Sequence, residues 1–268
     1  MSQWSDERLW DAVDAWRWVP PGSKRLVRDD FELAVTPGSY ALTYAYGLHA
    51  KDGPSAEDVP TELRRQVEAL GGTGVRVQIQ PNSRPPDLPD RLARRGYKVA
   101  EEAEALVWEL LDDRGRPRVP EFRPVEGVAV HEVRTTEEYD GFLSLSTPIF
   151  GDPSPSPASR AAFRHEFDRS LRELGHSDRF VAWDGTTPIG RAGLEVIEGV
   201  ARLWGAGVLP EHRQRGVYGL LVQARCAEAV RRGASLALTT ARVGTSGPIL
   251  KHHGFRAVGT VRLFEARW

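Results

Sequence analysis

The sequence has a single cysteine, Cys226, so it can build neither an internal disulfide framework nor a thiolate zinc cluster. Cys226 lies within an apolar helical pattern, which is typical of a small core residue. The sequence also lacks a run approaching the roughly 18 consecutive apolar residues of a membrane span, and its first residues lack the basic-then-apolar order of a signal peptide. We therefore expect a cytoplasmic protein without a membrane partner.

Signatures of metal and hydrolase chemistry are also missing. No cluster of His, Asp and Glu has metal-ligand spacing, and no Gly-x-Ser-x-Gly elbow is present, so we expect no metal ion and no serine hydrolase. Lysine is scarce, since it supplies only four of the 36 basic residues. We attribute this skew toward arginine to codon usage and predict no nucleic-acid partner.

The net charge of −1 hides an uneven distribution of charge along the chain. Residues 201–268 carry 11 basic and 3 acidic groups, a difference of +8, whereas residues 121–200 carry 8 and 14, a difference of −6. A basic segment suits a polyanion, and an acidic segment attracts a cation such as an amine. Asp152 and Glu166 are candidates to hold an ammonium group, although acidic surface residues without such a role are more common.

Length and patterning predict two α/β (α+β) units. A chain of 268 residues has room for two modest domains at roughly 100–200 residues each. The segment 113–127 is charged, rich in proline and aperiodic, as a linker is, which predicts domains at 1–112 and 128–268. Residues 92–97 resemble residues 250–255, with Gly96 and Gly254 in equivalent places. We infer that the first unit is a degenerate copy of the second.

Apolar periodicity predicts the elements of each unit. In the second unit, strands at 189–197 and 200–208 are joined by the dipeptide Glu198-Gly199. If this dipeptide is a two-residue hairpin turn, Glu195 lies opposite Arg202 on the same face of the sheet. The first unit is expected to have helices at 4–18, 61–70 and 88–95 and strands at 31–35, 40–48, 75–80 and 103–111. The second is expected to have further strands at 129–133, 179–183, 236–240 and 259–267 and helices at 136–145, 158–174, 217–231 and 248–253.

The most informative run follows the strand that ends at Val208. Glycines let the chain turn tightly between Arg213 and Gly219, and a helix begins immediately afterwards. Backbone amides at such a helix N-terminus, together with the helix dipole, bind a pyrophosphate. Two arginines add formal charge beside the amides. An ordinary strand-to-helix turn with a solvated basic face explains the same residues equally well.

At this run the sequence resembles the GCN5-related N-acetyltransferase (GNAT) family, whose signature is [Gln/Arg]-x-x-Gly-x-[Gly/Ala] after a strand. Here the signature reads Arg213-Gln-Arg-Gly216-Val-Tyr218, so Tyr218 departs from it and Gly219 follows one place later. The Gly254-Phe255 pair matches a second feature of the family. The tandem layout also resembles that of mycothiol synthase.

The resemblance implies two acyl-CoA N-acyltransferase folds, each with a mixed, mostly antiparallel sheet flanked by helices. It implies acetyl-CoA in a V-shaped gap between the strand that ends near Val208 and the strand 236–240. Backbone groups of the first strand would contact the pantetheine and polarise the thioester, and amides of the loop would take the pyrophosphate. The residues assigned to acetyl-CoA are Val208, Leu209, Arg213, Gln214, Arg215, Gly216, Val217, Tyr218 and Gly219.

The acid and base common in this family are both missing. Leu250 stands where many members have a tyrosine acid, and Arg202 stands where some have a glutamate base. Glu195 could act as a base through water, held by Arg202, or could form an ion pair without a chemical role. His253 and Ser246 are candidates for the acid because they could share the helical face of Leu250. A histidine beside a basic run is more often a surface residue.

These observations predict an acetyl-CoA-dependent N-acetyltransferase that acts on a primary amine of a small molecule, as a monomer or homodimer. One alternative is a non-catalytic acyl-CoA-binding protein, which the residues at 202 and 250 favour. Another is a transferase that uses a longer or carrier-bound acyl donor.

Overall fold

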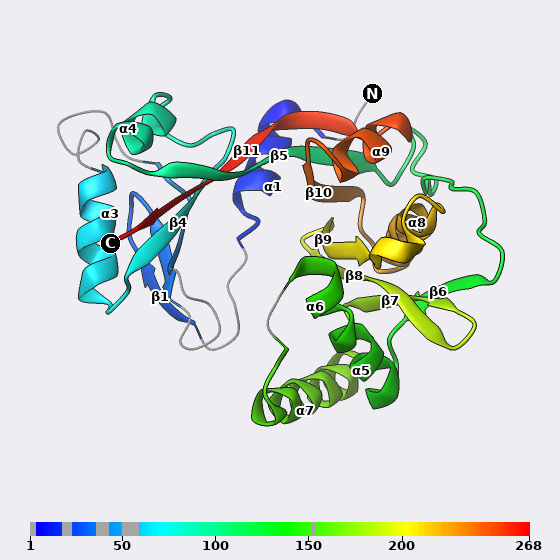
Figure 1. Cartoon of the computed structure of the whole chain (residues 1–268). Coiled ribbons are helices and arrows are strands. Elements are labelled where there is room, and N and C mark those ends of the chain that lie inside the picture. The colour runs from blue at the N-terminus through cyan, green and yellow to red at the C-terminus, as the bar shows by residue number, and fades with distance from the viewer. Residues whose placement is uncertain (1–3, 18–22, 36–42, 50–58, 152–153) are drawn as a thin grey trace. The chain divides into compact units, whose positions relative to one another are not determined.

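The computed structural model describes residues 4–17, 23–35, 43–49, 59–151 and 154–268 (Figure 1). The chain divides into two compact units that are not continuous in sequence. Unit 1 comprises residues 107–239 and 252–255, and unit 2 comprises the residues before 107 together with 240–251 and 256–268. The segment 113–127, expected to be a linker, belongs to unit 1. The domains expected at 1–112 and 128–268 therefore differ from the division that the contacts make.

The sheet of unit 1 has the strand order β6-β7-β8-β9-β10, antiparallel except for the last, parallel pair. Strands β7 to β9 and helix α8 match their predicted positions closely. Between α5 and α7 lies a short helix, α6, that sequence patterning missed. The elements are β6 (Val128–Glu132), α5 (Thr136–Ser144), α6 (Ser146–Phe150), α7 (Pro157–Leu174), β7 (Arg179–Asp184), β8 (Thr187–Ile197), β9 (Val200–Val208), a 3-10 turn (Pro210–His212), α8 (Val217–Arg231) and β10 (Leu236–Arg242).

The hairpin of β8 and β9 has the predicted register. Glu198 and Gly199 form a two-residue turn with φ of 49° and 77°, and Glu195 pairs with Arg202. The register then shifts between Arg191 and Gly193, where β9 bulges at Gly205 with φ of 56°. β10 pairs in parallel with β9 only over residues 200–202. The two strands therefore part before the end of β9, as the predicted V-shaped gap requires.

Helices cover both faces of these strands (Figure 1). On one face, Leu221 of α8 packs beside Gly190 of β8. On the other, Trp204 joins an apolar cluster with residues of α5 and α7, and its indole lies over Gly193. Because side chains alternate along a strand, Arg202 and Glu195 share the α5–α7 face with Trp204.

Unit 2 has the strand order β1-β2-β3-β4-β11-β5. Its core includes Leu33, Ala45, Leu63, Val77 and Phe264. β2 and β3 pair antiparallel, and the segment 36–42 that connects them lies outside the described residues. Sequence patterning missed β1. The elements are α1 (Asp6–Asp14), β1 (Lys24–Val27), β2 (Glu32–Val35), β3 (Thr43–Tyr46), α3 (Val59–Ala69), β4 (Gly74–Ile79), α4 (Leu88–Arg94), β5 (Lys98–Glu109), α9 (Ser246–His252) and β11 (Arg256–Arg267).

The weak sequence repeat has a structural counterpart. Gly96 and Gly254 have φ of 85° and 89°, and each follows a seven-residue helix, α4 or α9. Both conformations are left-handed, which favours glycine. The buried aromatics Tyr97 and Phe255 come next. In addition, β3 pairs in parallel with β4 as β9 does with β10. The two halves of the chain therefore share local structure as well as a sequence pattern.

Candidate functional site

The loop between β9 and α8 has the backbone of an anion-binding turn. Gln214 and Gly216 both have left-handed φ, of 61° and 90°, and Gly216 is the N-cap of α8. The N–H groups of Gly219 and Leu220 donate to the Gly216 carbonyl at 3.0 and 3.3 Å. The amides of Val217 and Tyr218 precede these bonds, and a helix offers no acceptor to its first amides. With the helix dipole, the turn fits a pyrophosphate.

The two glycines of the loop are required for different reasons. Gly216 needs its left-handed conformation, which side chains rarely adopt. Gly219 lies under the ring of Phe122, and a Cβ there would come within 3.0 Å of that ring. Gly219 is therefore explained by contact with the segment that precedes β6. This contact between residues distant in sequence could not be read from the motif.

The two arginines of the loop have partners within the protein. Arg213 donates from Nε to the Val208 carbonyl at 3.1 Å. Arg215 donates from Nη1 and Nη2 to Asp184 at 3.2 Å and from Nη1 to Nδ1 of His212 at 2.7 Å. Asp184 ends β7 and was not among the predicted site residues. It places a carboxylate beside the loop and offsets part of its positive charge.

The end of β9 presents one set of backbone groups toward the gap. The Leu209 N–H donates to the Ile189 carbonyl of β8 at 2.9 Å. Because alternate residues of a strand direct their peptide groups to opposite sides, those of Val208 point away from β8. Of the two predicted backbone contacts, Val208 therefore has the suitable direction, and the Leu209 amide is already used.

Glu195 and Arg202 lie where β9 and β10 begin to part. Arg202 is the last residue of β9 in register with β10. Its Nη1 is 3.3 Å from Oε2 of Glu195, and the two side chains are 12% and 43% exposed. The carboxylate is thus oriented by one ion pair and remains open to water on the α5–α7 face. The arrangement allows either a water-mediated base or a simple cross-strand ion pair.

Comparison with known proteins adds independent evidence. A model of the acetyltransferase (GNAT) family matches residues 141–246, which include β9, the loop and α8. An uncharacterized N-acetyltransferase of Bacillus subtilis (strain 168), YjcF, is 30% identical over 100 residues, which are 37% of this chain and 71% of that protein. The chain belongs to the GNAT family. It is accordingly an acyltransferase.

Solved structures of GNAT proteins share the fold across most of the chain. A GCN5-related N-acetyltransferase from Kribbella flavida has a TM-score of 0.65 at 18% identity, covering 91% of this chain and 89% of its own. A tandem GNAT protein from the clavulanic acid biosynthesis pathway has a TM-score of 0.59 at 17% identity, covering 96% and 87%. The mixed, mostly antiparallel sheet flanked by helices is therefore a GNAT fold.

The proposed acid residues of this GNAT protein have separate surroundings. α9 ends at His252, so His253 does not continue the helical face of Leu250 as predicted. His253 instead stacks on Phe122, with ring centroids 4.0 Å apart. Ser246 begins α9 in unit 2, where Leu250 is fully buried. Their catalytic roles stay predictions.

Sequence analysis did not predict the buried Arg191, which lies on β8 opposite the end of β9. Arg191 of β8 is 9% exposed, pairs with Gly207, donates to the Ser146 hydroxyl and to the Phe142 carbonyl at 3.3 Å, and stacks on the Phe142 ring at 3.6 Å. Gly207 leaves room for Ile149 of α6. Arg191 therefore fixes α5 and α6 beside the end of β9.

Of the predicted ammonium ligands, Glu166 is exposed on α7 and Asp152 lies outside the described residues.

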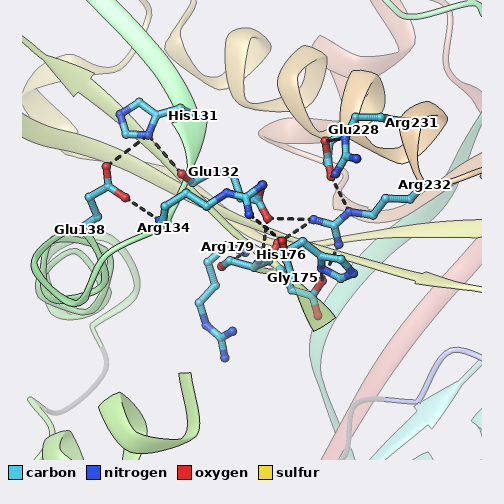
Figure 2. A network of polar contacts seen from close by, with 12 residues as sticks. His131, Glu132, Arg134, Glu138, Gly175, His176, Arg179, Glu228, Arg231 and Arg232 are labelled. Carbon is cyan, nitrogen blue, oxygen red and sulfur yellow. Dashed lines mark hydrogen bonds and ion pairs between the residues drawn. The ribbon is translucent and has the colours of Figure 1, made fainter. Parts of the chain in front are cut away.

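An ion-pair network fixes the other end of α8 (Figure 2). Arg232 is 7% exposed and binds Glu228 at 2.7 Å, Asp178 at 2.8 Å and Glu132 at 3.2 Å. It also donates to the Ser177 carbonyl at 2.7 Å. The network ties α8 to β6 and to the start of β7, so the direction of the helix that begins at the loop is set from its far end.

The described ranges contain neither a metal-binding group nor a membrane-spanning helix. No group of three or more His, Cys, Asp or Glu residues there could hold a metal ion. Among the described helices, none combines the length and apolarity needed to cross a membrane.

Proposed function

We propose that unit 1 transfers the acetyl group of acetyl-CoA to a primary amine of a small molecule. The observation that carries the proposal is the backbone of residues 213–219, in which Gly216 caps α8 and which follows the part of β9 that is no longer paired with β10. The loop amides would bind the pyrophosphate, and Val208 would hold the pantetheine. Residues 121–200, which include the helices α5, α6 and α7, have an acidic composition that suits a cationic acceptor.

The chemistry requires a neutral amine at the thioester carbonyl. Acetyl-CoA, when bound, supplies an activated acyl group whose carbon the amine nitrogen attacks. Glu195 would take the ammonium proton through water, and Arg202 would hold the carboxylate in place. His253 and Ser246 remain the proposed sources of the proton that the departing sulfur takes up. Arg191 would keep α5 and α6 against the site so that the acceptor meets a fixed wall.

A non-catalytic acyl-CoA-binding protein is the second proposal. Leu250 is fully buried, so a proton donor is missing where many GNAT members have one. Likewise, Arg202 stands where some GNAT members have a glutamate base, so that base is missing too. Such a protein would keep the pyrophosphate loop and bind acetyl-CoA without turnover.

Calorimetry of acetyl-CoA binding, followed by thiol release with a panel of amines, tests both proposals. Gly216→Glu should abolish binding, because it places a carboxylate and a strained backbone in the anion site. Gly244→Glu is the matched control, since a Cβ at Gly244 meets nothing within 4 Å. The protein's own thiol should not disturb the assay, because burial raises the pKa of Cys226 to about 12.

The outcomes separate the proposals. Binding with amine-dependent thiol release supports the transferase, and tight binding without release by any amine supports the second proposal. If the wild type does not bind acetyl-CoA, or if Gly216→Glu binds as the wild type does, the site is wrongly assigned.

A further inference from the structure

Arg225 is a buried charge without a carboxylate partner. It is 1% exposed on the sheet side of α8, and burial lowers the pKa of its guanidinium. Nε donates to the Leu221 carbonyl at 2.9 Å, and Nη1 donates to the Gly193 and Trp204 carbonyls at 3.1 and 3.5 Å. Within the described part of the chain, no carboxylate lies at ion-pair distance from it. Burying a charge in this way is costly.

The same helix provides a direct comparison. Arg232, seven residues further along α8, is also buried, but it has three carboxylate partners (Figure 2). The positive charge of Arg232 is therefore neutralised within the protein. That of Arg225 is balanced only by carbonyl dipoles, so its field extends into its surroundings, where the low dielectric preserves it.

Those surroundings are the bulge of β9. Gly193 and Trp204 form the last strand pair before the register shifts, and Gly205 follows with its left-handed φ. One guanidinium nitrogen thus faces carbonyls of both strands at the point where β9 changes direction. The residues beyond this point, 205–208, lead along the gap to the loop. Arg225 is placed to fix the peptide groups that would line the thioester.

Tyr218 lies on the same helix face as Arg225. The two residues are seven positions apart, or two turns, and Leu221 between them packs on Gly190. Tyr218 is also the residue at which the acetyl-CoA signature departs from the small residue expected. The residue that departs from the signature, Tyr218, and the buried Arg225 are therefore on one face of the same helix.

We propose that Arg225, with Tyr218 on the same face of α8, is a positioning residue for acyl transfer that fixes the bulge of β9 and places positive charge beneath the donor carbonyl. This inference rests on the proposed function. In the transfer, the amine nitrogen bonds to the acetyl carbon, the C–S bond breaks, and the sulfur leaves with the electron pair. The ammonium proton passes to the base before the attack, and the proton that the nitrogen loses as the amide forms balances the one that the departing sulfur takes up. Negative charge appears first on the carbonyl oxygen, and a fixed buried cation stabilises it without reorganisation.

The experiment compares Arg225→Met and Arg225→Lys with the wild type. Methionine fills a similar volume without charge, and such replacements of buried ions often preserve stability. We expect Arg225→Met to bind acetyl-CoA within about twofold of the wild type while kcat falls on the order of 100-fold, similar to the loss of one oxyanion donor. The KM for the amine should stay unchanged. Arg225→Lys should recover part of kcat, because it restores the charge.

A second readout does not depend on turnover. Isotope-edited infrared spectroscopy of bound acetyl-CoA should show the carbonyl stretch at lower frequency in the wild type than in Arg225→Met, because a nearby cation polarises the bond. Tyr218→Phe should give an intermediate shift and, because it keeps the helix face filled, tests the pair if Arg225→Met does not fold.

The proposal and the function on which it rests can fail separately. An infrared shift without turnover of any amine retains the role of Arg225 and favours the acyl-CoA-binding protein. Equal carbonyl frequencies in the wild type and Arg225→Met, or parallel losses of kcat, acetyl-CoA affinity and melting temperature, would show that Arg225 is only structural. Failure of the wild type to bind acetyl-CoA overturns both.

Discussion

The ring of Phe122 stacks on that of His253, with centroids 4.0 Å apart and planes inclined by 36°. The Phe122 N–H also bonds to α8, because it donates to Oε1 of Gln223 at 2.9 Å. Held in this way, the ring lies over Gly219 in the first turn of the helix. The segment before β6 thus secures the start of the helix whose amides form the candidate site.

Gly219→Ala should destabilise the protein. The added methyl would overlap the Phe122 ring, which His253 and Gln223 keep from moving, so we expect the free energy of unfolding to fall by about 1–3 kcal/mol. Denaturant unfolding measures this change. Gly244→Ala is the control, and adding Phe122→Ala to Gly219→Ala should recover part of the loss. Equal stability of Gly219→Ala and Gly244→Ala would contradict the contact.

Asp184→Asn should tighten acetyl-CoA binding. The carboxylate of Asp184 holds Arg215 at 3.2 Å and would compete with the pyrophosphate for it. Both side chains are more than a third exposed, so the pair is worth at most about 1 kcal/mol, and we expect Kd to fall a few-fold at low salt. Calorimetry at two ionic strengths should show the gain shrinking as salt increases. Glu198→Gln, at the opposite end of β8, should change nothing. Weaker binding by Asp184→Asn would mean that the carboxylate orients Arg215 for the ligand.

Glu195→Gln tests the proposed base. Loss of the carboxylate should lower kcat on the order of 100-fold while acetyl-CoA affinity stays unchanged, because general-base catalysis contributes about that much. The pH profile of kcat/KM should lose its acidic limb. Arg202→Met should lower kcat less than Glu195→Gln does, because it keeps the carboxylate but removes the side chain that orients it. Retention of wild-type kcat and pH profile by Glu195→Gln would leave only a cross-strand ion pair.

Glu228 should make stability depend on pH. Burial raises the pKa of this carboxyl, but hydrogen bonds from Arg231 and Arg232 outweigh burial and hold its pKa below the usual 4.5. A group with a lowered folded-state pKa stabilises the protein above its unfolded pKa and loses that contribution as pH falls. The wild type should therefore be more stable than Glu228→Gln at neutral pH, with the difference shrinking below about pH 4.5. An unchanged difference down to acid pH would contradict this role of the network.

Local patterns predicted the centre of unit 1 well. Apolar periodicity located β7, β8 and β9, and the turn dipeptide Glu198-Gly199 put Glu195 opposite Arg202. These features depend on residues close in sequence, so tertiary contacts had little opportunity to change them. The helix α6 was not predicted because it is only five residues long and contains Pro148, although it packs on Gly207.

The missed residues of the site act through contacts between distant parts of the chain. Asp184 and Arg215 are 31 positions apart, and neither residue alone signals the pair. Arg225 lies within an apolar helical face, where a long side chain is usually assumed to reach solvent. Only the packing of α8 on β8 and β9 shows that its charge stays inside. Likewise, no pattern in residues 113–127 indicated that Phe122 would cover the motif helix.

The pairing of β11 with β4 has a consequence for how the protein is made. Residues 74–79 leave the ribosome well before residues 262–267, with which they pair. The edge of β4 therefore waits without its neighbour during most of translation, and the N-terminal part cannot finish folding first. Splitting the gene near residue 113 would leave the first fragment with an unprotected strand edge and a tendency to aggregate. The N-terminal half of the chain therefore depends on β11, from the C-terminal end, to complete its sheet.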